Sequence, residues 1–218
     1  MYLKSSYVRP FDVEMKYQHQ PKRARKIAKD ASDDDDDDKD EDEVTFDVNS
    51  RSIYFTGEVN SNSIKKLRTS LNKINKHLWE NWMMNEYIYL TINSEGGSYF
   101  DSVSAMEFIK NNPFPVCTIA EGLCASAAVM IYMGGEYRIS RPSTSFLIHS
   151  IRSVLDGLVT HKDLTEEAQN SDFLTNNMWA QYKERTTLSK SRYDKLMSGE
   201  YLLSAKDVKA FGLCHEIS

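Results

Sequence analysis

A chain of 218 residues in which 40% are hydrophobic is long enough for one domain of about 150–200 residues and a tail. Residues 1–29 carry eight Lys or Arg against two acidic side chains, residues 30–43 carry eleven acids against one Lys, and residues 44–218 carry eighteen basic and nineteen acidic side chains. The longest segment is therefore nearly neutral, which argues against nucleic acid as the main partner.

The cysteines are Cys117, Cys124 and Cys214, an odd number without a C-x-x-C pair. Two of them lie in apolar runs, where a buried free thiol is the ordinary interpretation, and a reducing compartment is expected. No run approaches the roughly 18 apolar residues that span a membrane, and no apolar leader segment follows the first basic residue. We therefore expect a cytoplasmic protein without a membrane partner.

Residues 1–43 are predicted to form a disordered, charged tail or a removable propeptide. The basic run Lys22–Lys26 is followed by six consecutive aspartates, Asp33–Asp38, and a block of like charges repels itself. A basic arm for nucleic acid is the alternative, but the neighbouring acidic block would neutralise it. The globular domain is expected to comprise residues 44–218.

Within residues 44–218 the hydrophobic pattern alternates between short β-type runs and helical periods. One helical face is marked by apolar residues at spacings of 3, 4, 3 and 4, namely Ile64, Leu67, Leu71, Ile74 and Leu78. The expected strands are 52–57, 87–92, 116–120, 137–139, 146–148 and 200–203. The expected helices are 64–78, 103–109, 127–134, 160–185, a short one from Ser189, and one from Ser204 to Gly212. This alternation predicts an α/β fold of right-handed βαβ units with a mainly parallel sheet.

Chemistry is expected in three loops at the carboxyl ends of these strands, where parallel α/β units bind their ligands. These loops are Ser94–Ser98, Glu121–Ser126 and the segment after His149. Ser126 stands where an apolar helix begins, and the free N–H groups and partial positive charge there suit an anion forming beside a nucleophile. With a histidine at a strand end, this serine suggests nucleophilic acyl transfer.

Two backbone N–H groups would complete such a site. Glycine lets the backbone approach a ligand closely, so the N–H groups of Gly97 and of Ala127 would form an oxyanion hole. Losing one such donor typically raises the barrier by about 3 kcal/mol. A plain tight turn is the other interpretation of Gly96-Gly97. The sequence has no metal-ligand spacing, no G-x-x-x-x-G-K-[ST] phosphate loop and no G-x-S-x-G elbow of the α/β-hydrolases.

Five stretches resemble motifs of one family, the Clp protease proteolytic subunit (ClpP), and they follow one another in the family's order. Ile53–Gly57 is similar to its I-F-L-T-G, Ile92–Ser98 to I-N-S-P-G-G-S, Gly122–Ala128 to G-Q-A-A-S-M-G, Pro142–His149 to P-N-S-R-V-M-I-H, and Tyr201–Ala205 to F-L-S-A. The resemblance covers the chain from about residue 50 to its C-terminus. Its diverged ends and small size would suit a phage-encoded relative.

The resemblance implies a ClpP/crotonase-type fold with a protruding helix-and-strand handle, and a serine endopeptidase working in a ring-shaped chamber. It assigns Ser126 as nucleophile, His149 as general base, and Gly97 and Ala127 as oxyanion donors. The family's triad aspartate falls where this chain has Glu200. A glutamate can orient the imidazole, but a solvated acid is the other interpretation, with Asp194 and Asp207 as further candidate carboxylates.

Partners follow from the same resemblance. It implies a homo-oligomer, a heptameric ring or double ring, that degrades unfolded polypeptides. It also implies a separate AAA+ unfoldase as the user of ATP, so that no cofactor is expected in this chain. Ser198-Gly199 replace the family's Asp-Arg pair and Ser150–Gly157 replace its glycine-rich handle strand, so a single ring is an alternative to the double ring.

Two other functions stay open on the sequence. A non-catalytic ring subunit would keep the fold while Glu200 fails to orient His149. A crotonase-type acyl-CoA enzyme would share the fold and the oxyanion hole but would not need the Ser–His pair.

Overall fold

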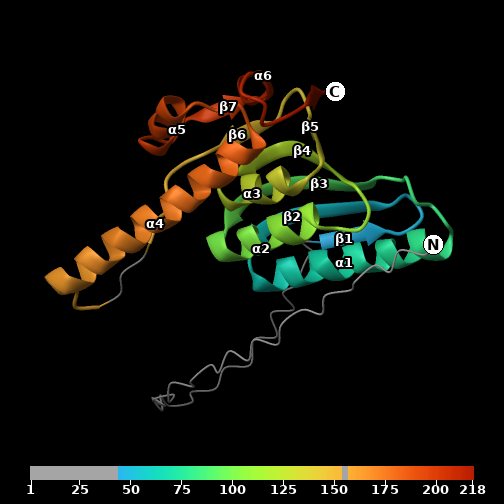
Figure 1. Ribbon diagram of the computed structural model, residues 1–218, viewed down its shortest axis with the longest axis horizontal. Coiled ribbons are helices and arrows are strands. Elements are labelled where there is room, and N and C mark those ends of the chain that lie inside the picture. The colour runs from blue at the N-terminus through green and yellow to red at the C-terminus, as the bar shows by residue number, and fades with distance from the viewer. Residues whose placement is uncertain (1–43, 154–156) are drawn as a thin grey trace, which may run out of the picture. The chain divides into compact units, whose positions relative to one another are not determined.

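A computed structural model describes residues 44–153 and 157–218 of the chain (Figure 1). The predicted tail, residues 1–43, lies outside the described residues. In the described part, eight strands form one sheet in the order β1-β2-β3-β4-β5-β8, with β6 beside β4 and β7 beside β6. The strands are β1 (Val44–Asp47), β2 (Ser52–Val59), β3 (Ile88–Gly97), β4 (Val116–Ala125), β5 (Tyr137–Ser140), β6 (Ser145–Leu147), β7 (Leu202–Ser204) and β8 (Glu216–Ile217).

The pairing is parallel from β2 to β8 and between β4 and β6, and antiparallel for β1 with β2 and for β6 with β7. The helices are α1 (Ser61–Glu80), α2 (Tyr99–Lys110), α3 (Ala127–Gly134), α4 (His161–Arg185), α5 (Lys190–Met197) and α6 (Ala205–Lys209). Two parallel crossovers, β2-α1-β3 and β3-α2-β4, therefore bear out the predicted βαβ arrangement.

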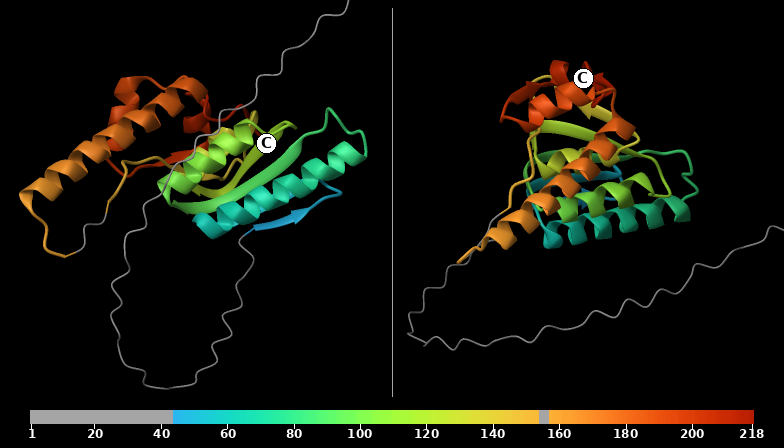
Figure 2. Two further views of the ribbon diagram at one scale, coloured as in Figure 1. Left: turned by 60° about the horizontal axis from the view of Figure 1, so that its bottom comes forward. Right: turned by 60° about the vertical axis from the view of Figure 1, so that its left-hand side comes forward.

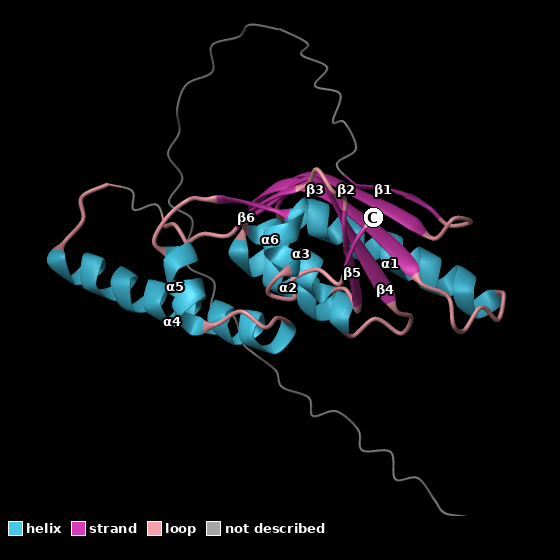
Figure 3. Ribbon diagram, turned by 90° about the horizontal axis from the view of Figure 1, so that it is seen from above, coloured by secondary structure: helices cyan, strands magenta, loops and turns pink. Residues whose placement is uncertain are grey.

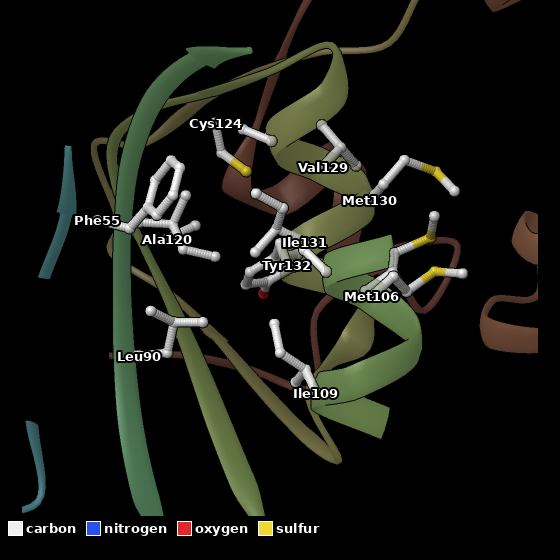
Figure 4. Packing of buried hydrophobic residues seen from close by; sticks show 14 of the residues in the cluster. Phe55, Leu90, Met106, Ile109, Ala120, Cys124, Val129, Met130, Ile131 and Tyr132 are labelled. Atoms are coloured by element: carbon white, nitrogen blue, oxygen red, sulfur yellow. The ribbon is translucent and has the colours of Figure 1, made fainter. Parts of the chain in front are cut away.

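Helices α1, α2 and α3 lie on the same face of the sheet (Figure 3). Helix α1 buries the apolar stripe predicted from the sequence, including Leu67, Leu71 and Leu78. Helix α3 is apolar on every side and every one of its residues is buried. Figure 4 shows its side chains Ile131 and Tyr132 between the sheet and helix α2. Burying one such side chain contributes about 1.5–3 kcal/mol, so this packing fixes the position of the α3 N-terminus.

Helix α4 corresponds to the predicted long helix and projects with its N-terminal half away from the sheet (Figure 2). Its buried residues, Met178 and Tyr182, lie in the C-terminal half. That end is anchored because Arg185 donates from Nε to the Met133 carbonyl at 3.0 Å and Lys110 pairs with Glu184. Ser150–Ser153 form no strand, so the strand expected in the handle is not found there, and residues 154–156 lie outside the described residues.

Two segments predicted as loops are parts of strands. Strand β3 continues through Gly97 and strand β4 through Ala125, with an irregular register between Ile92 and Ser94. The irregularity is held by Asn93, whose Oδ1 accepts from the Leu123 N–H at 3.0 Å, and by Gly122 at φ +67°. A bulge of this kind bends a strand without ending it. The loop prediction was wrong because glycine and asparagine indicate a bulge as well as a turn.

Candidate active site

Parallel pairing of β4 with β6 brings Ser126 and His149 together. Ala125, the last residue of β4, pairs with Leu147, the last of β6, and the Ser126 N–H donates to the Leu147 carbonyl at 2.8 Å. His149 follows two residues later, and its Nε2 lies 2.9 Å from the Ser126 Oγ. Two residues 23 positions apart therefore meet because both follow the carboxyl ends of paired strands.

The backbone of Ser126 is held in an unusual conformation at the start of α3. Its φ is 53° and its ψ is −124°, a region that costs a non-glycine residue about 1–3 kcal/mol. Ser126 is the N-cap residue of α3, yet its side chain makes no capping hydrogen bond. At α2, α5 and α6 the capping serine does accept a backbone N–H. The Ser126 hydroxyl is therefore left to His149.

Two glycines at the end of β3 let that strand lie close to its neighbours, Gly96 against the Ser126 turn and Gly97 against strand β2. A Cβ on Gly96 would lie 2.7 Å from the Ala125 carbonyl oxygen and 2.9 Å from the Ala127 nitrogen. A Cβ on Gly97 would lie 2.3 Å from the Val59 carbonyl oxygen. Both have positive φ, +104° and +144°. Glycine is required at both positions, which argues against the plain tight turn as the whole explanation.

Gly97, Ser126, Ala127 and His149 line the same cavity of about 590 Å³. The first N–H groups of a helix lack partners within it, so the Ala127 N–H is available to a ligand. Part of the wall is apolar, from Met130, Leu174 and Met178, and part is charged, from Glu95, Arg152 and Glu200. A cavity with an apolar wall and a few convergent polar groups is typical of a substrate site.

The pKa of His149 is lowered from its ordinary value of 6.5, chiefly by burial and then by the positive charge of Arg152. A backbone interaction with Ser150 acts in the opposite direction. Burial disfavours the charged imidazolium, so His149 is neutral at pH 7. A neutral imidazole with Nε2 facing a hydroxyl is in the state that a general base requires.

The side chain of Glu200 makes no hydrogen bond with His149. Its carboxylate forms an ion pair with Arg152, and the buried Nδ1 of His149 has no hydrogen-bond partner among the described residues. The other two candidate carboxylates are engaged elsewhere. Asp194 pairs with Lys190 on α5, and Asp207 accepts from the Ser204 N–H at 2.9 Å as part of the capping box of α6.

The sequence interpretation overlooked Arg152. Its position three residues after His149, in a segment that departs from the resembled family, is the signal that could have drawn attention to it. The cysteines are no rival nucleophiles, because burial raises the thiol pKa of Cys117 to about 11 and also raises those of Cys124 and Cys214. Among the described residues no group of three or more His, Cys, Asp or Glu could hold a metal ion. Within that same part of the chain, no helix is long and apolar enough to cross a membrane.

A mainly parallel sheet of βαβ units with a serine and a histidine at adjoining strand ends defines an α/β protein with a Ser–His pair at the carboxyl edge of its sheet. More particularly, the chain belongs to the Clp protease family, whose family model matches residues 37–218. This confirms the family inferred from the five motifs.

Similar proteins agree with that assignment. The ATP-dependent Clp protease proteolytic subunit of Chlorella vulgaris is 30% identical over 139 residues, which cover 62% of this chain and 67% of the relative. Proteolytic subunit 2 of Treponema denticola is 28% identical over 174 residues, 78% of this chain and 83% of the relative. The solved structure of a ClpP1 mutant from Listeria monocytogenes is 23% identical in sequence and superposes with a TM-score of 0.68. The match covers 78% of this chain and 92% of the ClpP1 chain. That likeness confirms the predicted fold.

Proposed function

We propose that this chain is a serine endopeptidase subunit of a ring-shaped, chambered protease that cleaves unfolded proteins through an acyl-enzyme. One observation carries the proposal: the Ser126 Oγ lies 2.9 Å from the His149 Nε2 on the wall of a cavity large enough for a peptide segment. The strained Ser126 backbone is further support, because such strain clusters at functional sites.

The chemistry follows from the positions of these atoms. His149 Nε2 accepts the hydroxyl proton as the Ser126 Oγ bonds to the substrate carbonyl carbon. The carbonyl oxygen becomes an oxyanion and accepts from the N–H groups of Gly97 and Ala127. The imidazolium then returns the proton to the leaving amine. Water, activated by the same imidazole, hydrolyses the ester and frees Ser126.

The third group of the proposed triad is Glu200. In a triad the carboxylate accepts the imidazole N–H and stabilises the charged ring. Glu200 belongs to the same cavity as His149, which supports this role, although its carboxylate pairs with Arg152 in the structure. That ion pair favours the second candidate, a non-catalytic ring subunit, because loss of triad orientation can cost about 10⁴ in rate.

We further propose a homo-oligomeric ring and a separate ATPase partner. The relatives are described as proteolytic subunits of an ATP-dependent protease, while the sequence of this chain contains no G-x-x-x-x-G-K-[ST] loop. ATP would then be used by the partner. Sedimentation velocity of the full chain distinguishes a monomer, a single heptameric ring and a double ring.

Peptide hydrolysis tests the proposal. The wild-type chain should cleave an unfolded protein and short fluorogenic peptides without ATP, whereas Ser126→Ala and His149→Gln should abolish cleavage. Ser140→Ala is the control for serine removal at the end of a strand away from the cavity. Equal rates for wild type and Ser126→Ala would refute the assignment of Ser126, and no cleavage by the wild type would favour the non-catalytic subunit.

A further inference from the structure

The polar groups around His149 are paired in an unexpected way. Nδ1 of His149 is buried without a hydrogen-bond partner among the described residues, while the carboxylate of Glu200, which lines the same cavity, is paired with Arg152. An unpaired buried polar atom is costly. The arrangement therefore leaves an unmet hydrogen bond at the proposed base and gives the carboxylate that could meet it to another residue.

The register of β6 and β7, continued beyond the last pair of the two strands, would place Glu200 opposite His149. In the antiparallel pair of β6 and β7, Phe146 pairs with Leu203 and Leu147 with Leu202. Extending this register by two residues pairs His149 with Glu200. Residues directly opposite one another in an antiparallel pair have Cβ atoms about 4.5–5.5 Å apart. A change of side-chain rotamer would thus bring the Glu200 carboxylate to Nδ1, with no rearrangement of the sheet.

Among the charged side chains near His149, Arg152 is the one that competes with the imidazole for the Glu200 carboxylate. Of the described residues that line the cavity, the charged ones are Glu95, Arg152 and Glu200. Tyr99 from α2 and Tyr182 from α4 also line it, and burial raises the pKa of both phenols, so they stay neutral. Arg152 is therefore the cation among these side chains, and its charge also helps to lower the pKa of His149.

We propose that Arg152 is a positioning residue that holds Glu200 away from His149, so that activity depends on exchange of Glu200 between the two. This inference rests on the proposed function and adds a means of regulation to it. With Glu200 on Arg152, His149 can act as a base but its imidazolium lacks a carboxylate partner. With Glu200 on Nδ1, the three side chains form a complete triad.

The exchange is open to adjustment because the ion pair is exposed, at 65% for the Arg152 side chain and 55% for Glu200. Exposed pairs of this kind typically shift a two-state population by no more than about threefold to fivefold. Removing the guanidinium should therefore raise the rate of Ser126 acylation by about threefold to fivefold. Salt near 1 M, where the Debye length is about 3 Å, weakens the same ion pair and should also raise the acylation rate of the wild type.

The imidazole titration of His149, followed by NMR on the full chain, tests the exchange whether or not the protein is active. The His149 pKa should lie below 6.5 in the wild type, where Glu200 does not touch the ring. It should also lie below 6.5 in Glu200→Gln, where the carboxylate is absent. It should rise above 6.5 in Arg152→Gln, because Glu200 then reaches Nδ1. It should fall below 6.5 again in the double variant Arg152→Gln/Glu200→Gln, since the rise depends on the carboxylate.

Labelling with a fluorophosphonate probe supplies the kinetic readout. Arg152→Lys, which keeps the charge, should label at the wild-type rate, and Arg152→Gln should label faster. Arg141→Gln is the matched control, because Arg141 is also an exposed arginine paired with a carboxylate, that of Glu121 at 3.8 Å.

Two results would overturn the inference. One is a His149 pKa that stays below 6.5 in Arg152→Gln. The other is a wild-type His149 pKa above 6.5, which would mean that Glu200 already contacts the ring. A failure of the proposed function looks different, because the wild type and all variants would then resist labelling while the NMR titrations still report the exchange.

Discussion

Replacing Gly96 by alanine would place a methyl group against the turn that carries Ser126. The new Cβ would lie 2.7 Å from the Ala125 carbonyl oxygen and 2.7 Å from the Ser126 Cβ. The backbone at φ +104° adds strain of about 1–3 kcal/mol for any residue with a side chain, and overpacking adds about 1–3 kcal/mol more. The free energy of unfolding should fall by about 2–6 kcal/mol, the sum of these two costs.

Gly157→Ala is the matched control, because Gly157 also has a positive φ, +84°, but no atom of the described residues beyond its chain neighbours lies within 4 Å of the added Cβ. The free energy of unfolding of Gly157→Ala should fall only by the backbone strain, about 1–3 kcal/mol. For a protein of this size 1 kcal/mol corresponds to about 2–4 °C in Tm, so thermal denaturation separates the two variants. Fluorophosphonate labelling should slow as much as about 100-fold in Gly96→Ala, the typical effect of displacing a reacting group by about 1 Å. Equal Tm and equal labelling for both variants would show that Gly96 does not shape the Ser126 turn.

The other predictions concern acidity, strain, thiols and a buried arginine. Burial and a neighbouring cation hold the pKa of His149 below 6.5, so His149 loses its base form only below that pH. The acid limb of the labelling rate against pH should therefore have a midpoint below 6.5. A midpoint above 6.5 would contradict the assignment of His149 as the base. Ser126→Gly should be more stable to urea than Ser126→Ala by about 1–2 kcal/mol, because only glycine tolerates the φ of 53° without strain; equal stabilities would remove the case for a strained nucleophile. Cys124 is fully buried and its thiol pKa is raised, so iodoacetamide should leave it unmodified in the native protein, as peptide mapping would reveal. The guanidinium of the buried Arg138 side chain donates to the carbonyls of Leu213, Gly135, Arg185 and Gly212. Arg138→Met should therefore lower the free energy of unfolding in urea by about 3 kcal/mol or more. A loss under about 1 kcal/mol would contradict that role.

Much of the fold could be predicted because apolar spacing reports burial directly. The 3-4-3-4 stripe of α1 and the run of small and apolar residues in α3 each have one stable solution, a helix against the sheet. Strand β8, of two residues, was not predicted, because so short a run carries no periodic signal. The continuation of β3 and β4 past their glycines was also missed, since a bulge and a turn use the same residues.

The candidate site, like the fold, could be predicted only in part. Ser126 and His149 could be paired from the sequence because both follow strands, and the carboxyl ends of neighbouring parallel strands meet at one edge. The partner of Glu200 could not be predicted in this way. It depends on the rotamers of two long, exposed side chains, Arg152 and Glu200, and rotamers leave no pattern in the sequence.

The most direct test of a nucleophilic Ser126 is peptide mapping by mass spectrometry after reaction of the full chain with a fluorophosphonate probe. We predict one adduct, on Ser126, in the wild type, and none in Ser126→Ala or in heat-denatured protein. An adduct on another serine, or equal labelling of wild type and Ser126→Ala, would contradict the proposed mechanism.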